Sequence, residues 1–120
     1  MPDSPEEVHA LFCRFMREGD LEALLTLYDD DAVFCNRAGE LRVGRDALRE
    51  ELRPLASAKT EFRFRILRKI ATDDVMLVHA RYEMGGPEPQ SGHAVEVFLC
   101  HPEDGWRFLI GDPFTIGAAG

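Results

Sequence analysis

Residues 19–52 constrain the fold more than any other segment, because sharp breaks alternate there with apolar periodicity. Gly19 is placed to end one helix, and Asp20 can begin the next by accepting hydrogen bonds from the free N–H groups of its first turn. Leucine residues then recur at helical spacing as far as Tyr28, which gives this second helix one apolar side. The pattern predicts two consecutive helices that meet at an abrupt turn.

An acidic run separates the second helix from a short apolar segment. We expect the three aspartates at 29–31 to end the helix in water, and residues 32–35 to form a short strand that enters the core. A turn that contains glycine follows. Asp46 is then placed to cap a third helix, and Pro54 is expected to close it because proline has no N–H group to continue the helical hydrogen bonds.

The two halves of the chain carry different periodicities. Ser4 and the residues after it form a capping box, so the chain opens with a helix. From residue 60 onward apolar and polar residues alternate, which predicts four strands at 60–70, 75–84, 93–100 and 106–115. Helices first and strands afterwards indicate an α+β domain with its helices packed on one face of a curved sheet. With 120 residues, the whole chain is expected to form one domain.

Charge and composition argue against several classes of protein. The net charge of −8 disfavours nucleic acid as a partner, and no apolar run is long enough for a membrane helix. The first residues lack the basic and apolar parts of an export signal, and the three cysteines lie in apolar patterns as reduced core thiols do, so we expect a cytoplasmic protein. The cysteines and the four histidines lack the paired spacing of metal ligands, so no metal site is expected.

Both faces of the predicted sheet are apolar, since successive side chains of each strand point to opposite sides. The three expected helices can cover only one of these faces. A second copy of the chain is the simplest cover for the other. We therefore expect a homodimer through a sheet face made by six apolar residues: Met76, Val78, Tyr82, Val95, Val97 and Leu99.

Charged residues interrupt the apolar rows of the remaining face. Arg81 and Glu83 share one strand, Glu96 lies on the next strand, and Asp112 lies on the last. Unpaired charges in a dry interior are costly, so two arrangements remain open. Either these groups pair with one another at a wet edge of the sheet, or they line a cavity that opens to solvent.

The order of helix, Gly19-Asp20 break, helix, acidic turn, strand and "GRDAL" helix resembles the first half of the nuclear transport factor 2-like superfamily. That superfamily includes ketosteroid isomerases, SnoaL-like polyketide cyclases, limonene epoxide hydrolase and the association domain of a calmodulin-dependent kinase. The resemblance implies a cone-shaped domain whose mixed or antiparallel sheet curves around an internal pocket. It implies either a cyclase, isomerase or hydrolase that acts without a cofactor on a small apolar molecule, or a non-catalytic binding or assembly domain.

Ketosteroid isomerase activity is not expected. Enzymes of that kind use a tyrosine as oxyanion donor, an aspartate that moves the proton, and a protonated aspartate that helps the tyrosine. The resemblance aligns these roles with Phe12, Asn36 and a position near Glu96. Phenylalanine cannot donate a hydrogen bond and an amide cannot shuttle a proton, so two of the three roles are lost.

Epoxide hydrolysis fits the aligned residues better. In limonene epoxide hydrolase a Tyr-x-Asn pair and an aspartate hold the water, and an Arg-x-Asp pair bridges that aspartate and protonates the epoxide. The resemblance assigns Asp112 as the base and Asn36 as a water ligand. Arg81 would fix the two acids, and Glu83 would be the proton donor. Phe34 stands where that enzyme has its tyrosine, which removes one water ligand.

The same resemblance indicates which side chains would surround a bound molecule: Phe12, Tyr28, Phe34, His79, Glu96, Phe98 and Phe108. Two of them have a simpler interpretation. Tyr28 continues a stripe of leucines, where packing in the core accounts for it. His79 fits a hydrogen-bonded wall residue better than a base.

Overall fold

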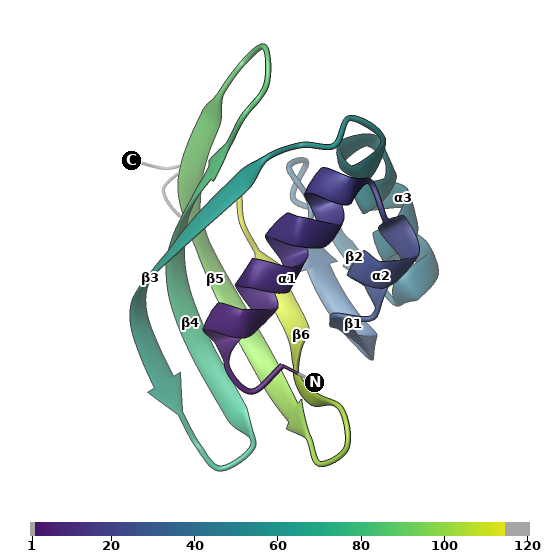
Figure 1. Ribbon diagram of the computed structural model, residues 1–120. Coiled ribbons are helices and arrows are strands. Elements are labelled where there is room, and N and C mark those ends of the chain that lie inside the picture. The colour runs from purple at the N-terminus through teal and green to yellow at the C-terminus, as the bar shows by residue number, and fades with distance from the viewer. Residues whose placement is uncertain (1, 115–120) are drawn as a thin grey trace.

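The structure is a computed structural model, and it describes residues 2–114. Within that range the helices are α1 (Pro5–Glu18), α2 (Leu21–Leu25) and α3 (Arg45–Ser57). The strands are β1 (Tyr28–Cys35), β2 (Leu41–Val43), β3 (Phe62–Ala71), β4 (Val75–Met84), β5 (Gln90–His101) and β6 (Gly105–Asp112). All the helices lie on one side of the sheet, with α1 across its middle and α3 beside β1 and β2 (Figure 1).

The strands form one open sheet in the order β2-β1-β6-β5-β4-β3. Strand β1 runs parallel to β6, whereas the other neighbouring strands are antiparallel, so the sheet is mixed. The long strands β3, β4 and β5 bend around α1 (Figure 1). This confirms the predicted α+β fold, in which three N-terminal helices pack on one face of a curved mixed sheet. Residue 115, which the sequence placed in the last strand, lies outside the described residues.

The first break in the chain forms as predicted. Ser4 caps α1 by accepting a hydrogen bond from the backbone N–H of Glu7, and α1 ends at Gly19. Gly19 has a φ of 72°, a left-handed conformation that glycine adopts without steric cost. Asp20 then caps α2 by accepting from the N–H of Ala23. These local contacts turn the chain sharply from α1 into α2.

The acidic run does not end a helix in water, and this prediction is wrong. Helix α2 stops at Leu25, and Tyr28 already begins β1, which contains all three aspartates. Asp29 is only 8% exposed, because its carboxylate accepts hydrogen bonds from the N–H of Asp31 and pairs with His101 at 2.8 Å. These partners offset the desolvation of the charge, and the bond from Asp31 in particular holds the pKa of Asp29 below its ordinary value.

The structure differs from the prediction at both ends of the third helix. Gly44, with a φ of 88°, precedes the first turn of α3, whereas Asp46 lies inside that turn and pairs with Arg49. Pro54 lies within α3 rather than at its end. Its side of the helix is exposed, so water can bond the carbonyl group that proline leaves without a donor. The turn before α3 also contains the short strand β2, which the sequence pattern did not predict.

The sheet has an inner face, which the helices cover, and an outer face, which they leave uncovered. Val78 of β4 is the register partner of Glu96 of β5, and Leu77 is the partner of Val97. Partners in register point to the same side, so Val78 and Glu96 share the inner face and Leu77 and Val97 share the outer face. The six residues expected to form one dimer face are therefore divided. Inner residues are Met76, Val78 and Tyr82; outer residues are Val95, Val97 and Leu99.

The hydrophobic core fills the space between the helices and the inner face. Fully buried members come from both layers: Val8, Met16, Leu24, Leu48, Val78, Ala80 and Phe98. Burial of these side chains is the main force that holds the helices on the sheet. No helix within residues 2–114 has the length and apolar character needed to cross a membrane.

Candidate functional site

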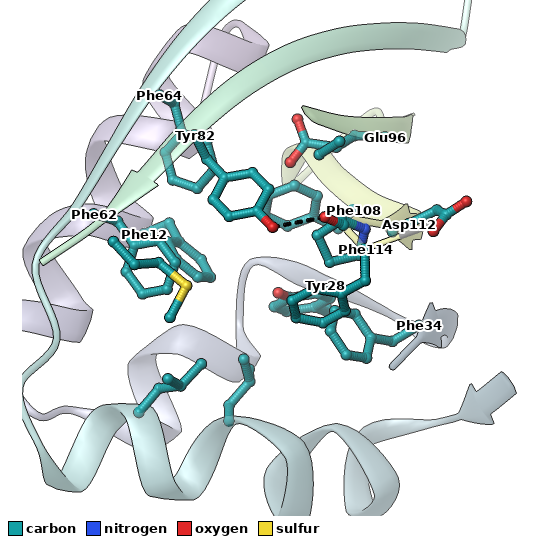
Figure 2. A pocket seen from close by; sticks show the side chains of 16 residues that line it. Phe12, Tyr28, Phe34, Phe62, Phe64, Tyr82, Glu96, Phe108, Asp112 and Phe114 are labelled. Atoms are coloured by element: carbon teal, nitrogen blue, oxygen red, sulfur yellow. Dashed lines mark hydrogen bonds between the residues drawn. The ribbon is translucent and has the colours of Figure 1, made fainter. Parts of the chain in front are cut away.

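A small cavity of about 70 Å³ lies between the helices and the inner face of the sheet. We call it the aromatic cavity, because rings from α1, β1, β3, β4 and β6 form most of its wall (Figure 2). The rings are those of Phe12, Tyr28, Phe34, Phe62, Phe64, Tyr82, Phe108 and Phe114.

The rings hold one another in defined orientations. Phe12 meets Phe62 and Phe64 edge to face, with ring centres 5.2 and 5.5 Å apart. Tyr28 stacks on Phe108 with ring centres 4.8 Å apart. Both geometries are favourable for aromatic pairs, so the wall is set by mutual packing of strands and helix α1.

One carboxylate enters this apolar wall. Glu96 projects from β5 and is 6% exposed. Its Oε1 lies 2.7 Å from Nε2 of His9, which comes from α1 and is itself 5% exposed. The His9 ring stacks on Phe64 with centres 4.3 Å apart, which fixes the direction in which the imidazole points. Glu96 is thus held from behind by a histidine, and this is its only hydrogen bond to a side chain within residues 2–114.

Tyr28 supplies a hydroxyl to the same cavity. Burial raises the pKa of Tyr28 far above its ordinary value, and the negative charge of Glu96 raises it further. The phenol is therefore neutral at physiological pH and can donate a hydrogen bond. Within residues 2–114 its hydroxyl has no hydrogen-bond partner, so a bound molecule could accept that bond.

The hydroxyl of Tyr82, the other tyrosine of the cavity, already has a hydrogen-bond partner. The Tyr82 hydroxyl donates to the carbonyl oxygen of Pro113 at 2.7 Å, which ties the segment after β6 to the cavity wall (Figure 2). The register partner of Tyr82 is Gly92, where an added Cβ would lie 2.8 Å from the hydroxyl oxygen. The absence of a side chain at Gly92 is what allows Tyr82 to occupy this position.

The four residues expected to activate water do not meet in one place. Arg81 and Glu83 are exposed on the outer face, as partners of His93 and Ser91. Asn36 lies in the turn after β1 and bonds the side chains of two glutamates. Asp112 lines the cavity, but its carboxylate points away from it (Figure 2). The arrangement needed for epoxide hydrolysis, inferred from single aligned positions, is therefore not formed.

Most of the residues expected around a ligand do line the cavity: Phe12, Tyr28, Phe34, Glu96 and Phe108. Phe98 is fully buried behind the wall and packs on Phe108, with ring centres 4.7 Å apart. His79 lies on the outer face, bonded to His93, and takes no part in the cavity. Whether the lining residues bind a molecule stays a prediction.

Sequence reasoning missed His9, the partner of Glu96. His9 stands three residues before Phe12, so it belongs to the buried stripe of α1. A titratable side chain on such a stripe needs a buried partner, and this was the available signal. Glu96 is 87 residues away along the chain, so the local sequence pattern around His9 could not identify it as the partner. Within residues 2–114 no group of three or more His, Cys, Asp or Glu side chains is arranged to hold a metal ion.

Comparisons with known proteins agree with this architecture. Solved structures described as nuclear transport factor 2-like share the fold at 13–19% identity. The model of the SnoaL-like domain family matches residues 8–107, so the chain belongs to that family. No curated protein matches the chain.

Several solved structures have the same fold. A proposed calcium/calmodulin-dependent protein kinase type II association domain from Thiobacillus denitrificans ATCC 25259 superposes with a TM-score of 0.78 at 18% identity, over 95% of this chain and 98% of that one. A proposed dehydratase of the superfamily from Streptomyces avermitilis gives 0.68 at 19% identity, over 89% and 90%. The epoxide hydrolase/cyclase-like enzyme SalBIII, which acts in pyran ring formation in salinomycin, gives 0.62 at 24% identity, over 91% and 88%. Such distant similarities show the fold and leave the activity open.

Proposed function

We propose that this protein binds a small, mostly apolar carbonyl compound in the aromatic cavity and rearranges it by acid–base chemistry. The observation that carries the proposal is the buried carboxylate of Glu96, held by His9 in an otherwise apolar wall that also contains the free hydroxyl of Tyr28. A buried carboxylate is costly to maintain, so its presence at a cavity favours a functional role.

Each group has a role in this chemistry. Glu96 would remove a proton beside the carbonyl group and return it at another position. Tyr28 would donate a hydrogen bond to the oxygen on which negative charge develops. His9 would act as a positioning residue that keeps one oxygen of Glu96 fixed while the other is available for the proton. No cofactor is needed for these steps.

The size of the cavity limits the substrate. Sites for small molecules usually enclose about 300–1,000 Å³, well above the volume found here. The bound state therefore needs rotation of some rings, and the rings of Phe34 and Phe114, which meet edge to face with centres 6.2 Å apart, are candidates. We expect a compact substrate with few polar atoms.

Proton exchange provides a test that does not need the natural substrate. Small enolisable ketones and aldehydes would be incubated with the protein in D₂O, and loss of the α-proton signal would be followed by NMR. We expect exchange above background, reduced about 100-fold or more by Glu96→Gln, since general acid–base catalysis contributes roughly 10²–10⁴-fold. Glu83→Gln is the matched control, because Glu83 is exposed on the outer face. Equal loss in both variants, or in the control alone, would refute the assignment.

A non-catalytic role is the second candidate, and the small volume of the cavity favours it. In that case the pair of Glu96 and His9 is a structural contact between β5 and α1. Glu96→Gln would then change the free energy of unfolding, and no member of the carbonyl panel would exchange its proton faster than background. The fold shared with a proposed kinase association domain is compatible with such a binding or assembly role.

We also propose a homodimer, through the apolar part of the outer face. Large apolar side chains remain exposed there, including Leu77 at 38% and Ile110 at 43%. Val97 of β5 is the register partner of both, and Leu99 lies two residues further along the same face of β5. A second copy would cover this area in a symmetric contact. The cytoplasmic location stays a prediction.

A further inference from the structure

The outer face carries a group of basic side chains on three neighbouring strands, which we call the basic cluster: Arg63, Arg65, Arg68, His79, Arg81 and His93. It runs along the outer face from the middle of β3 and β4 toward the β4–β5 hairpin. All four arginines are exposed. The chain as a whole has a net charge of −8, so a basic cluster of this density is unusual for its composition.

The register of the strands brings like charges opposite each other. Arg65 of β3 is the partner of Arg81 of β4, and Arg81 is in turn the partner of His93 of β5. Arg68 is the register partner of His79. Two like charges directly opposite one another destabilise a sheet, so the pair of Arg65 and Arg81 does not serve stability.

Carboxylates do not neutralise the cluster. Within residues 2–114 none of its four arginines has a carboxylate oxygen within 4.0 Å, whereas Arg42 of β2 and Arg45 and Arg49 of α3 are all paired. Glu83 is the register partner of Arg63, and the two still form no ion pair. The free guanidinium groups offer planar pairs of N–H donors, which match the oxygens of phosphate and carboxylate groups.

A groove beside the cluster has the size of a ligand site. Its volume is about 330 Å³, and Arg63, Arg81, Ser91 and Gln90 contribute to its wall. Glu61 and Glu83 line it as well. These carboxylates would repel an anion, so the negative part of a ligand has to lie at the end nearest Arg65, Arg81 and His93.

We propose that the basic cluster binds a small multivalent oxyanion, a phosphoryl or polycarboxylate group, between Arg65, Arg81 and His93. The uncharged or cationic remainder of the ligand would extend along the groove toward Glu61 and Glu83. The site is separate from the aromatic cavity, because inner and outer residues of the same strands point to opposite sides of the sheet.

The two histidines add a directional contact to the site. Nε2 of His79 lies 3.0 Å from Nδ1 of His93, so one ring donates to the other. When His79 donates, the proton of a neutral His93 is on Nε2, and that N–H can bond the anion. Binding therefore selects one of the two proton arrangements, with His93 as the donor to the ligand.

The test compares anions at equal ionic strength with sodium chloride as the reference. Inorganic phosphate, pyrophosphate and citrate would be titrated while the midpoint of thermal unfolding and the binding heat are measured. We expect pyrophosphate and citrate to raise the midpoint by several degrees more than chloride does. The phosphate compounds and citrate separate phosphoryl from polycarboxylate preference. Equal effects of all salts would mean screening alone and would overturn the proposal.

Variants then locate the site. The double variant Arg65→Gln/Arg81→Gln should weaken the preferred anion at least tenfold, and without anions it should unfold at or above the wild-type midpoint because the opposed charges are gone. The double variant Arg17→Gln/Arg53→Gln is the matched control, since both arginines are exposed and free of ion pairs within residues 2–114. Unchanged affinity in the first variant, or an equal loss in the control, would refute the site.

Discussion

On the inner face of the sheet Glu96 is buried against His9, whereas on the outer face Arg65 and Arg81 stand opposite each other in water. The inner charge needs a partner because desolvation of an unpaired carboxylate costs several kcal/mol, on the order of what holds a small domain folded. The outer charges are screened by solvent, so their repulsion costs little. The comparison shows how folding constrains function. A charged group on the inner face needs a partner within the protein, whereas a charged group on the outer face can remain unpaired until a ligand binds.

The largest difference between the two faces is expected when a glutamate is introduced on each of them in turn. Val78→Glu puts a carboxylate at a fully buried inner position directly opposite the carboxylate of Glu96, and Lys69 on its other side is already paired with Glu6. We expect a loss of more than about 4 kcal/mol in the free energy of unfolding, enough to unfold much of the protein. Val97→Glu, on the outer face, should leave the fold intact by circular dichroism.

The second variant also tests the proposed dimer. Val97 lies at the centre of the apolar part of the outer face, so a charge there should convert dimers to monomers or aggregates. Sedimentation of wild type and variant at micromolar concentration measures this. A wild-type protein that sediments as a monomer would contradict the dimer, and a Val78→Glu protein as stable as wild type would contradict the assignment of the faces.

The sequence determined which residues alternate within each strand but not how neighbouring strands align. In β4 and β5 the two sets of side chains follow directly from the period of two. The register across the β4–β5 hairpin decides which set of β4 side chains shares a face with which set of β5 side chains. A shift of the register by one residue would move each β5 side chain to the other face. For this reason the sequence grouped Glu96 with Arg81, although Glu96 is the partner of Val78. Helix ends such as Gly19 were predictable because their signals are local.

The candidate site was predictable only in part, for the same reason. The aromatic residues that line the cavity stand out by composition and alternation, and Phe12, Tyr28 and Phe108 were expected there. The contact between His9 and Glu96 depends on how α1 crosses the sheet, which no local pattern specifies. Asp29 was misplaced because its burial depends on His101, a residue 72 positions away.

A smaller effect is expected from crowding the inner face at Gly92. Gly92→Ala would place a Cβ 2.8 Å from the Tyr82 hydroxyl oxygen and displace the ring from its bond to Pro113. Overpacking of this kind costs about 1–3 kcal/mol. Urea unfolding of the variant measures the loss. The double variant Gly92→Ala/Tyr82→Phe should lose less than the sum of the two single losses, because removal of the hydroxyl makes room; strictly additive losses would show that the two residues do not compete.

The stability of the protein at alkaline pH tests whether Tyr28 is buried on the inner face. Tyr28 in the unfolded chain ionises near pH ~10, but burial and the charge of Glu96 raise its pKa in the folded state. Between these values the unfolded chain holds fewer protons than the folded one, so the free energy of unfolding falls as pH rises, by up to about 1.4 kcal/mol per pH unit. This stabilisation is fully present below pH ~10 and is lost above it.

Tyr28→Phe removes the group that causes this loss. We expect urea unfolding of the variant to depend less on pH than that of wild type between about pH 9 and 11. Burial raises the pKa of Tyr82 as well, so Tyr82→Phe should also reduce the pH dependence, and the double variant Tyr28→Phe/Tyr82→Phe should reduce it further. Identical pH dependence in wild type and Tyr28→Phe would mean that Tyr28 ionises normally in the folded protein and is not buried beside Glu96.

The smallest effect belongs to the outer face itself, at Ile110. This side chain is 43% exposed, so Ile110→Thr keeps a β-branched residue and removes little buried surface from a single chain. For a monomer we expect a change within about 0.5 kcal/mol in the free energy of unfolding, as for other exposed substitutions. If a second copy covers this face, the loss becomes larger as protein concentration rises, because association stabilises only the wild type. Urea unfolding at two concentrations, with sedimentation at each, distinguishes these cases. A large loss at a concentration where the wild type is monomeric would show that Ile110 packs within its own chain, and the outer face would then be less open than the structure indicates.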